Sequence, residues 1–245
     1  MKVKAVFISH LHGDHLLGLP GLLQTMGMSG RKERILVAGP KGLEEAMTCL
    51  MKACGGETGY DIDVVEAADG DRFFFKGYTV RTFGVDHNVP ALGFALEEDE
   101  RPGRFDRSKA MSMGLEPGPD FSRLQRGETV RNVRPSDVIG PVRKGRKVVY
   151  SGDTIRCASI SEAAKDADVL IHEATYSSAD TGLAREHMHS TAADAALTAK
   201  EADVSLLVIT HVSNRYEDPS VLEQECREIF PDTILAKDMM TLTVK

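Results

Sequence analysis

The chain has 245 residues, a formal net charge of −7 and 42% hydrophobic residues. This composition is ordinary for a globular chain, and it excludes the collagen-like, disordered and disulfide-stapled classes. No apolar run approaches the ~20 residues that cross a membrane, so no membrane partner is expected. The four cysteines are scattered and form no CxxC pair, and we therefore expect reduced thiols in a cytoplasmic protein.

Hydrophobic patterning along the chain predicts an α/β fold. In chain order, strands are predicted at residues 3–9, 34–38, 61–66, 72–75, 78–85, 92–96, 147–150, 169–171 and 206–209, and near Ile234 and Thr241. Helices are predicted at residues 16–28, 41–53, from beyond 150 to 164, 191–202 and 220–229. Thr191 and Asp194 have the spacing of a helix capping box. At this length we expect one domain over residues 1–245.

Residues 101–147 differ in composition from the rest of the chain. They hold twelve Lys or Arg against five Asp or Glu, and five of the ten prolines. A basic, Pro-rich segment inside an acidic chain indicates an excursion from the core. It is either a solvated surface loop or an arm that contacts a phosphate backbone.

The segment His10-Leu11-His12-Gly13-Asp14-His15 directly follows the first predicted strand. Residues two apart in an extended segment share a side, so His10 and His12 can point to one metal ion. Gly13 allows a sharp change of direction, after which Asp14 and His15 can face a second position. Imidazole and carboxylate groups are common ligands of first-row metals, and zinc is the default. Four potential ligands in six residues argue against a polar strand end without a metal.

Three further candidate ligands follow later apolar strands, namely His87, Asp153 and His211. Ligand sites in α/β proteins gather where strands end, so this shared position makes the three a candidate set. A carboxylate has two oxygens, and Asp153 could bridge two ions. On its own, Asp153 could equally be a helix N-cap.

Several motifs resemble those of ribonuclease Z, the tRNA 3′-processing endonuclease of the metallo-β-lactamase superfamily. These motifs are FISHLHGDHLLGLPGLL, YSGDT, LIHEATY, HMHSTAADAALTAKEA and LVITHVSNRY, and the likeness runs from Val3 to about Lys237. The HxHxDH pattern indicates only the superfamily, whereas HEAT, HST and the PGP of the basic segment are similar to ribonuclease Z. The resemblance implies an α/β fold of two packed β-sheets flanked by helices (αββα).

The resemblance also implies roles for individual residues. Two zinc ions per chain would be bound, the first by His10, His12, His87 and Asp153, and the second by Asp14, His15, Asp153 and His211. Asp14 would be the general base, and His189, oriented by Glu173, would protonate the leaving group. An arm around residues 115–130 would grip precursor tRNA, and the residues expected to bind RNA are Arg104, Arg107, Lys109, Pro117, Gly118, Pro119, Arg123 and Arg126. His172 and His187 are expected either to be structural or to support the metal ligands through hydrogen bonds.

This chemistry agrees with general physical principles. Two nearby cations lower the pKa of a water between them, so hydroxide becomes available for attack on a phosphodiester near neutral pH. The departing ribose oxygen needs a proton, and a histidine held by a carboxylate can supply it. The first predicted function is therefore removal of 3′ trailers from tRNA precursors, which leaves a 3′-hydroxyl on the tRNA. Judged from the sequence pattern alone, His189 could instead be a solvent-exposed histidine at the start of a helix. Glu173 could be an ordinary acidic residue at the end of a strand.

Two other functions stay open, namely hydrolysis of small phosphodiesters or aryl sulfates and RNA binding without catalysis. Members of the family begin with a further strand-rich segment, so we expect a first sheet that is truncated on its N-terminal side, with an exposed edge. The chain would then be a short form or one whose start is misplaced, with its metal ligands retained and its nuclease activity weak. A two-fold homodimer could cover the exposed sheet.

Overall fold

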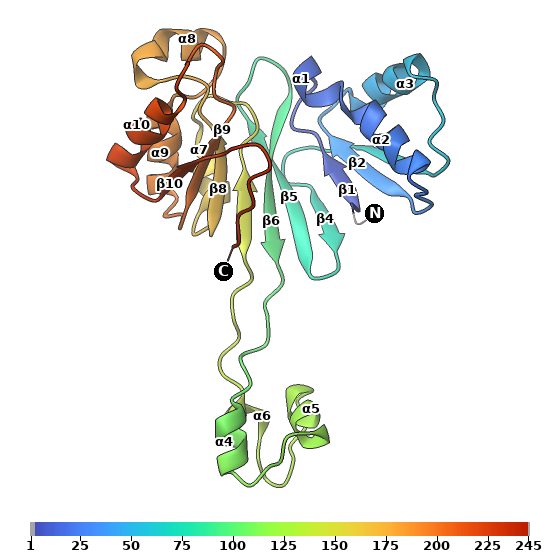
Figure 1. The fold of residues 1–245 in the computed structure, drawn as a ribbon, viewed down its shortest axis with the longest axis vertical. Coiled ribbons are helices and arrows are strands. Elements are labelled where there is room, and N and C mark those ends of the chain that lie inside the picture. Colours follow the sequence, from blue (N-terminus) through green and yellow to red (C-terminus); the bar gives the residue numbers. More distant parts are fainter. Residues whose placement is uncertain (1–2, 245) are drawn as a thin grey trace. The chain divides into compact units, whose positions relative to one another are not determined.

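The protein is represented by a computed structural model that describes residues 3–244 (Figure 1). It divides into two compact units. The core unit comprises the residues up to 97 and those from 146 onward, and the arm unit comprises residues 98–145. Nearly all of the basic segment 101–147 therefore lies in the arm unit.

The first sheet of the core unit is parallel and has the order β1-β2-β3. Its strands are β1 (Ala5–Phe7), β2 (Ile35–Gly39) and β3 (Ile62–Glu66). Helices α1 (Gly13–Leu16), α2 (Leu19–Met28) and α3 (Leu43–Ala53) alternate with them in the sequence. Leu23, Leu43 and Ile35 are fully buried in the core that these helices share with the sheet, so this half is a parallel β-sheet with helices on its outer face.

The second sheet has seven strands in the order β10-β9-β8-β7-β6-β5-β4. The strands are β4 (Arg72–Phe75), β5 (Tyr78–Val85), β6 (Ala91–Glu98), β7 (Lys147–Tyr150), β8 (Val169–Glu173), β9 (Leu207–Thr210) and β10 (Thr233–Leu235). Strands β7 to β10 run parallel to one another, whereas β6 is antiparallel to β7. Parallel neighbours end at the same edge of the sheet, which brings the residues after β7, β8 and β9 together.

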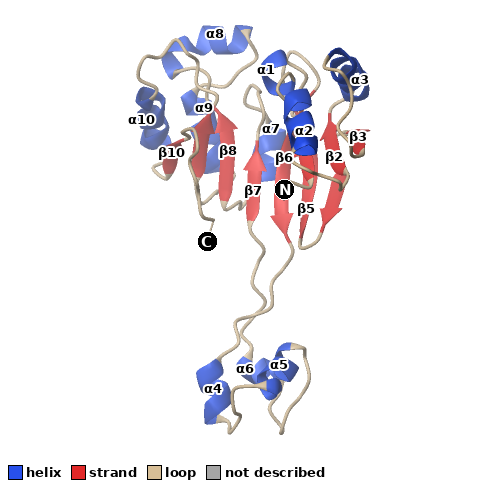
Figure 2. Ribbon diagram, turned by 45° about the vertical axis from the view of Figure 1, so that its right-hand side comes forward, coloured by secondary structure: helices blue, strands red, loops and turns tan. Residues whose placement is uncertain are grey.

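Four layers result, because each sheet carries helices on one face and packs on the other sheet with the opposite face (Figure 2). Phe7 of β1 lies between the sheets, with its ring centroid 5.3 Å from those of both Phe73 and Phe94. The outer helices of the second sheet are α7 (Ala158–Ala164), α8 (Thr181–Glu186), α9 (Ala192–Glu201) and α10 (Ser220–Ile229), with a short 3₁₀ helix, η1, at Ser178–Asp180. The described residues include no helix both long and apolar enough to cross a membrane.

Helix α9 shows how the sequence sets one of these elements. Its predicted capping box is confirmed: Asp194 N donates to Thr191 Oγ1 at 3.2 Å, and Thr191 N donates to Asp194 Oδ2 at 3.0 Å. The alanines on its inner face, such as Ala195 and Ala199, are fully buried. Small side chains let the helix approach β8 and β9 closely, and this contact positions the loop that precedes the helix.

Two sequence predictions of secondary structure are wrong. The helix expected at 16–28 is divided into α1 and α2, because Pro20 lacks an N–H and fits the first turn of a helix but not its interior. The strand expected near Thr241 is absent from residues 236–244. The sequence pattern also did not predict α8 or the three short helices of the arm unit.

The arm unit has a small apolar core of its own. Its helices are α4 (Arg107–Ser112), α5 (Pro119–Gln125) and α6 (Pro135–Val138). They enclose Leu124, Val130 and Val138, which are 3% exposed or less. Isolated bridges pair Arg101 with Arg143 and Phe105 with Ile139, so the two ends of the arm run side by side. The basic segment is thus a folded arm with its own core.

Candidate active site

The candidate ligands of the core unit all lie just beyond strand ends. The segment 10–15 follows β1 and includes the first residues of α1, His87 follows β5, Asp153 follows β7 and His211 follows β9. A hydrogen bond from Leu92 N to Ser9 O, 2.8 Å long, joins the end of the first sheet to β6 of the second. Because both sheets end here, residues from widely separated parts of the sequence meet at one edge.

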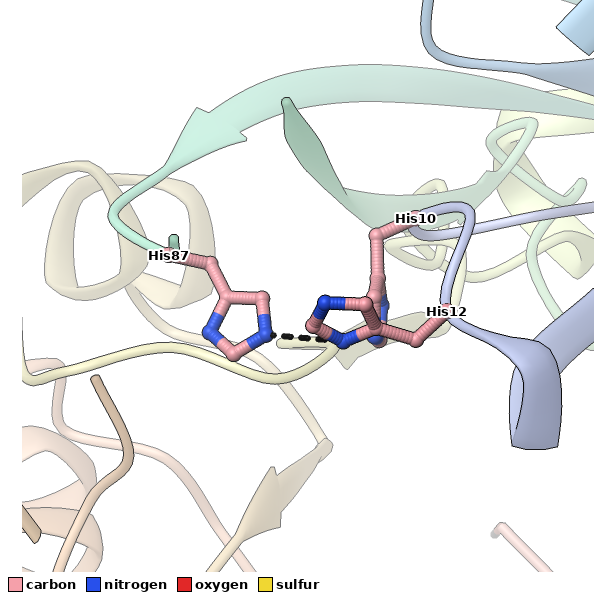
Figure 3. Close-up of side chains that lie close together, drawn as sticks. All are labelled: His10, His12 and His87. Atoms are coloured by element: carbon pink, nitrogen blue, oxygen red, sulfur yellow. Dashed lines mark hydrogen bonds between the residues drawn. The ribbon is translucent and has the colours of Figure 1, made fainter. Parts of the chain in front are cut away.

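Three histidines form the first group. His10, His12 and His87 each offer a ring nitrogen, and these atoms lie within 4.8 Å of one another (Figure 3). His12 Nδ1 lies 3.4 Å from His87 Nε2. The other ring nitrogen of His87 is 2.9 Å from the carbonyl oxygen of Met188. A carbonyl only accepts hydrogen bonds, so His87 Nδ1 carries the proton and Nε2 presents a lone pair to the group.

Asp14, His15 and His211 form a second group of the same size. Asp14 Oδ2 lies 3.4 Å from His15 Nε2 and 4.0 Å from His211 Nε2. The two groups are adjacent, since the rings of His10 and His15 have centroids 4.0 Å apart. The site therefore offers two neighbouring positions for cations.

Asp153 lies between the two groups. Its Oδ2 atom is 3.7 Å from His10 Nε2, 3.3 Å from His15 Nε2 and 3.2 Å from His211 Nε2. It is not a helix N-cap, because the following helix α7 begins at Ala158 with Cys157 as its N-cap. Its carboxylate thus reaches both groups.

Two buried atoms in this cluster have no hydrogen-bond partner among residues 3–244, namely His10 Nε2 and Asp153 Oδ1. Burial and the neighbouring His15 lower the pKa of His10 to about 4, so its imidazole is neutral at pH 7. Burial alone would raise the pKa of Asp153, but the hydrogen bond with His15 and the charges of His211 and His15 lower it to about 2. Buried polar atoms normally have partners. Orphaned lone pairs on neutral imidazole and ionised carboxylate fit a bound cation such as Zn²⁺.

Glu173, the last residue of β8, lies beside the metal positions and is 1% exposed. Its Oε1 atom accepts hydrogen bonds from Thr154 N at 2.9 Å and from His189 Nδ1 at 2.8 Å. Burial would lower the pKa of His189, but the hydrogen bond to Glu173 outweighs burial and raises it. The His189 ring centroid is 5.2 Å from that of His87 and 5.3 Å from that of His211. A carboxylate-held imidazole therefore borders both metal positions.

Comparison with known proteins places this site in a family. The chain matches the Beta-lactamase superfamily domain at residues 1–105 and 120–212. It is 45% identical over 250 residues to Ribonuclease Z of Methanosarcina mazei, a match that covers 100% of this chain and 82% of that protein. It is 46% identical over 232 residues to Ribonuclease Z of Myxococcus xanthus, covering 92% of this chain and 76% of that protein. The chain belongs to the ribonuclease Z family.

A solved structure agrees with this membership. The crystal structure of human tRNase Z, short form, superimposes with a TM-score of 0.66 and is 26% identical, covering 100% of this chain and 80% of that chain. The predicted fold of two packed sheets flanked by helices is thereby confirmed. For a chain of the ribonuclease Z family, the strand-end site is the candidate hydrolytic centre.

Sequence reasoning overlooked Thr175 at this site. Its hydroxyl oxygen lies 2.7 Å from Glu173 Oε2 and 2.8 Å from His211 Nδ1. The sequence offered one indication of this residue: it stands two positions after Glu173, which ends a buried strand. The other two histidines lie outside the metal groups found among residues 3–244: His172 is fully buried with Nδ1 2.6 Å from Glu173 O, and His187 stacks on Tyr176.

The residues expected to bind RNA fall into three groups in the arm unit. Arg123 and Arg126 both pair with Glu128, at 2.8 Å and 3.3 Å respectively. Arg104, Arg107 and Lys109 are exposed, and within the described residues none of them forms an ion pair. Pro117, Gly118 and Pro119 form the start of α5, where Gly118 has φ 151° and ψ −143°, a conformation open essentially only to glycine.

Proposed function

We propose that this chain removes 3′ trailers from tRNA precursors by hydrolysing one phosphodiester at the strand-end site with two bound Zn²⁺ ions. The observation that carries the proposal is the meeting of His10, His12, Asp14, His15, His87, Asp153 and His211 in two adjacent groups beside the Glu173–His189 pair. Membership of the ribonuclease Z family supports tRNA as the substrate. The reaction breaks the bond between phosphorus and the 3′-oxygen, so the tRNA keeps a 3′-hydroxyl and the trailer keeps the phosphate.

The zinc assignment rests on the chemistry of the donor groups. Neutral imidazole and carboxylate groups in tight clusters suit Zn²⁺, and Asp153 Oδ2 lies near His10 of the first group and near His15 and His211 of the second. When bound, two divalent cations lower the pKa of water held between them and offset negative charge on the phosphate oxygens.

The protein side chains supply the proton transfers. Asp14 is the general base: its side chain is 71% exposed at the open side of the cluster, where it can accept a proton from the attacking water. His189 donates a proton to the departing 3′-oxygen, and Glu173 holds its ring in place through Nδ1. Glu173 is the buried orienting group of this pair, in the same sense as the carboxylate of a hydrolytic triad.

The arm unit supplies contacts to the tRNA backbone. Arg104, Arg107 and Lys109 are exposed arm cations with no ion pair among the described residues, and we take them as the first candidates for phosphate contacts. Arg123 and Arg126 are partly neutralised by Glu128, so they contribute less. Phosphate contacts release counterions, and binding through this arm should therefore weaken as salt rises.

We extend the proposal to assembly and location. A two-fold homodimer is supported by exposed apolar side chains on α2 and the turn before it, namely Leu17, Leu22 and Met28. Sedimentation of the purified chain tests whether it is a dimer.

The four cysteines are free thiols, which supports a reducing compartment such as the cytoplasm.

The decisive experiment is incubation of zinc-loaded protein with a tRNA that carries a 3′ extension, followed by mapping of both product ends. We expect a mature tRNA with a 3′-hydroxyl and a trailer with a 5′-phosphate. Cleavage of bis(p-nitrophenyl) phosphate without cleavage of the precursor would instead identify a small-molecule hydrolase. RNA binding that survives Asp14→Ala, with no turnover of either substrate, would identify a non-catalytic RNA-binding protein.

A further inference from the structure

Thr175 connects the buried carboxylate of Glu173 to a histidine of the second metal group. Its Oγ1 atom lies 2.7 Å from Glu173 Oε2 and 2.8 Å from His211 Nδ1. Thr175 itself is buried, with 6% of its surface exposed. Its backbone ties the same two strand ends together, because Ser213 N donates to Thr175 O at 3.1 Å. The hydroxyl is therefore held in place on both sides.

Counting donors and acceptors settles the direction of these hydrogen bonds. A hydroxyl has one proton to donate, and an ionised carboxylate can only accept. The Thr175 proton therefore goes to Glu173 Oε2, which also accepts from Thr175 N at 3.0 Å. Glu173 Oε1 is taken by Thr154 N and His189 Nδ1, so all four hydrogen bonds to this buried carboxylate come from fixed donors.

The hydroxyl of Thr175 can then only accept from the imidazole rings. His189 Nδ1 is closer to Glu173 Oε1, at 2.8 Å, than to Thr175 Oγ1, at 3.3 Å, so its proton goes to the carboxylate. The donor to Thr175 is thus His211 Nδ1. In the neutral form of the ring, which has one N–H, the lone pair is then on His211 Nε2. That nitrogen is the one 3.2 Å from Asp153 Oδ2.

We propose that Thr175 is a positioning residue that fixes the tautomer and ring orientation of His211, so that Nε2 faces the second metal position. This inference rests on the proposed metal site, but the hydrogen-bond chain from Glu173 through Thr175 to His211 exists without a metal. One buried carboxylate thereby orients two histidines, His189 directly and His211 through the hydroxyl.

The test uses Thr175→Val and Thr175→Ser. Valine keeps the branched shape and rotamer preference of threonine but removes the hydroxyl, and serine restores it. Thr198→Val is the matched control: Thr198 is fully buried in α9, and its hydroxyl donates to Asp194 O at 2.8 Å, so the same chemical change is made in a helix. The probe is Zn²⁺ alone, titrated calorimetrically into chelator-stripped full-length protein.

We expect two Zn²⁺ sites in the wild type, with one of them weakened about 10- to 100-fold in Thr175→Val, the range typical when a metal-binding histidine loses its hydrogen-bond partner. Thr175→Ser and Thr198→Val should retain both affinities. Wild-type affinity at both sites in Thr175→Val would overturn the inference while leaving the proposed function intact. A wild type that binds no Zn²⁺ would overturn the proposed function instead.

A second measurement is read on the wild type, without Thr175 variants. Long-range proton–nitrogen correlation spectra of the metal-free wild type report which nitrogen of each histidine is protonated, and His211→Asn assigns the signals of His211. We expect the proton on Nδ1 of His211. A proton on Nε2 with none on Nδ1 would contradict the role of Thr175, whatever the metal content.

Discussion

Glu173 Oε1 lies 2.8 Å from His189 Nδ1, and Glu173 is buried with all its other hydrogen bonds satisfied by the protein. This contact directs the remaining nitrogen of His189 away from the carboxylate. His189 can then hold a proton beside the metal positions, where the leaving oxygen must depart.

His189→Ala should lower kcat for precursor tRNA about 10²- to 10⁴-fold, because the leaving 3′-oxygen loses its proton donor. Cleavage of bis(p-nitrophenyl) phosphate should be spared, since its leaving group is a weak base and needs no proton. His187→Ala is the matched control: this histidine stacks on Tyr176 and should leave kcat close to the wild type. Equal losses on the two substrates would show that His189 acts in some other way.

Asp153→Asn should reduce bound Zn²⁺ from two ions per chain to one or none, because an amide nitrogen replaces a carboxylate oxygen that faces both groups. Elemental analysis of dialysed protein measures the change. Asp203→Asn, at an exposed residue with φ 51° that asparagine tolerates, should keep two. Two bound zinc ions per chain in Asp153→Asn would show that the carboxylate of Asp153 is not needed to hold both ions.

Replacing Arg104, Arg107 and Lys109 together by alanine should raise KM for precursor tRNA without changing hydrolysis of bis(p-nitrophenyl) phosphate. The slope of log affinity against log salt should fall by about 1 for each phosphate that the arm no longer neutralises. A triple replacement of Lys32, Lys52 and Lys76, exposed cations of the core unit, removes the same charge as a control. If both triple variants weaken binding equally, the arm has no special role.

Thr191→Ala should lower the free energy of unfolding by about 0.5–2 kcal/mol, because it removes the hydroxyl of the α9 capping box. Urea denaturation measures this value. The control Thr48→Ala removes an exposed hydroxyl that donates to Glu44 O within α3, and the loss there should be smaller. An unchanged free energy in Thr191→Ala would mean that packing alone holds the start of α9.

Prediction of secondary structure succeeded where the pattern was local and regular. The bounds of β4, β5, β7 and α10 agree with those expected from apolar periodicity. It failed at the break between α1 and α2, where a single residue, Pro20, decides the geometry. It also missed α4 to α6, because short helices in a Pro-rich, basic segment depend on contacts such as those of Leu124 and Val138 in the arm core.

The sequence by itself identified the candidate metal ligands, because the local pattern shows histidines and carboxylates directly after predicted strands. Its motifs also indicated the family. Only the tertiary structure decided how those residues meet. Asp153 and His211 come within 3.2 Å because β7, β8 and β9 are parallel and end at one edge. The contacts of Thr175 were also decided by the tertiary structure, since the fold places Glu173 and His211 on either side of its hydroxyl.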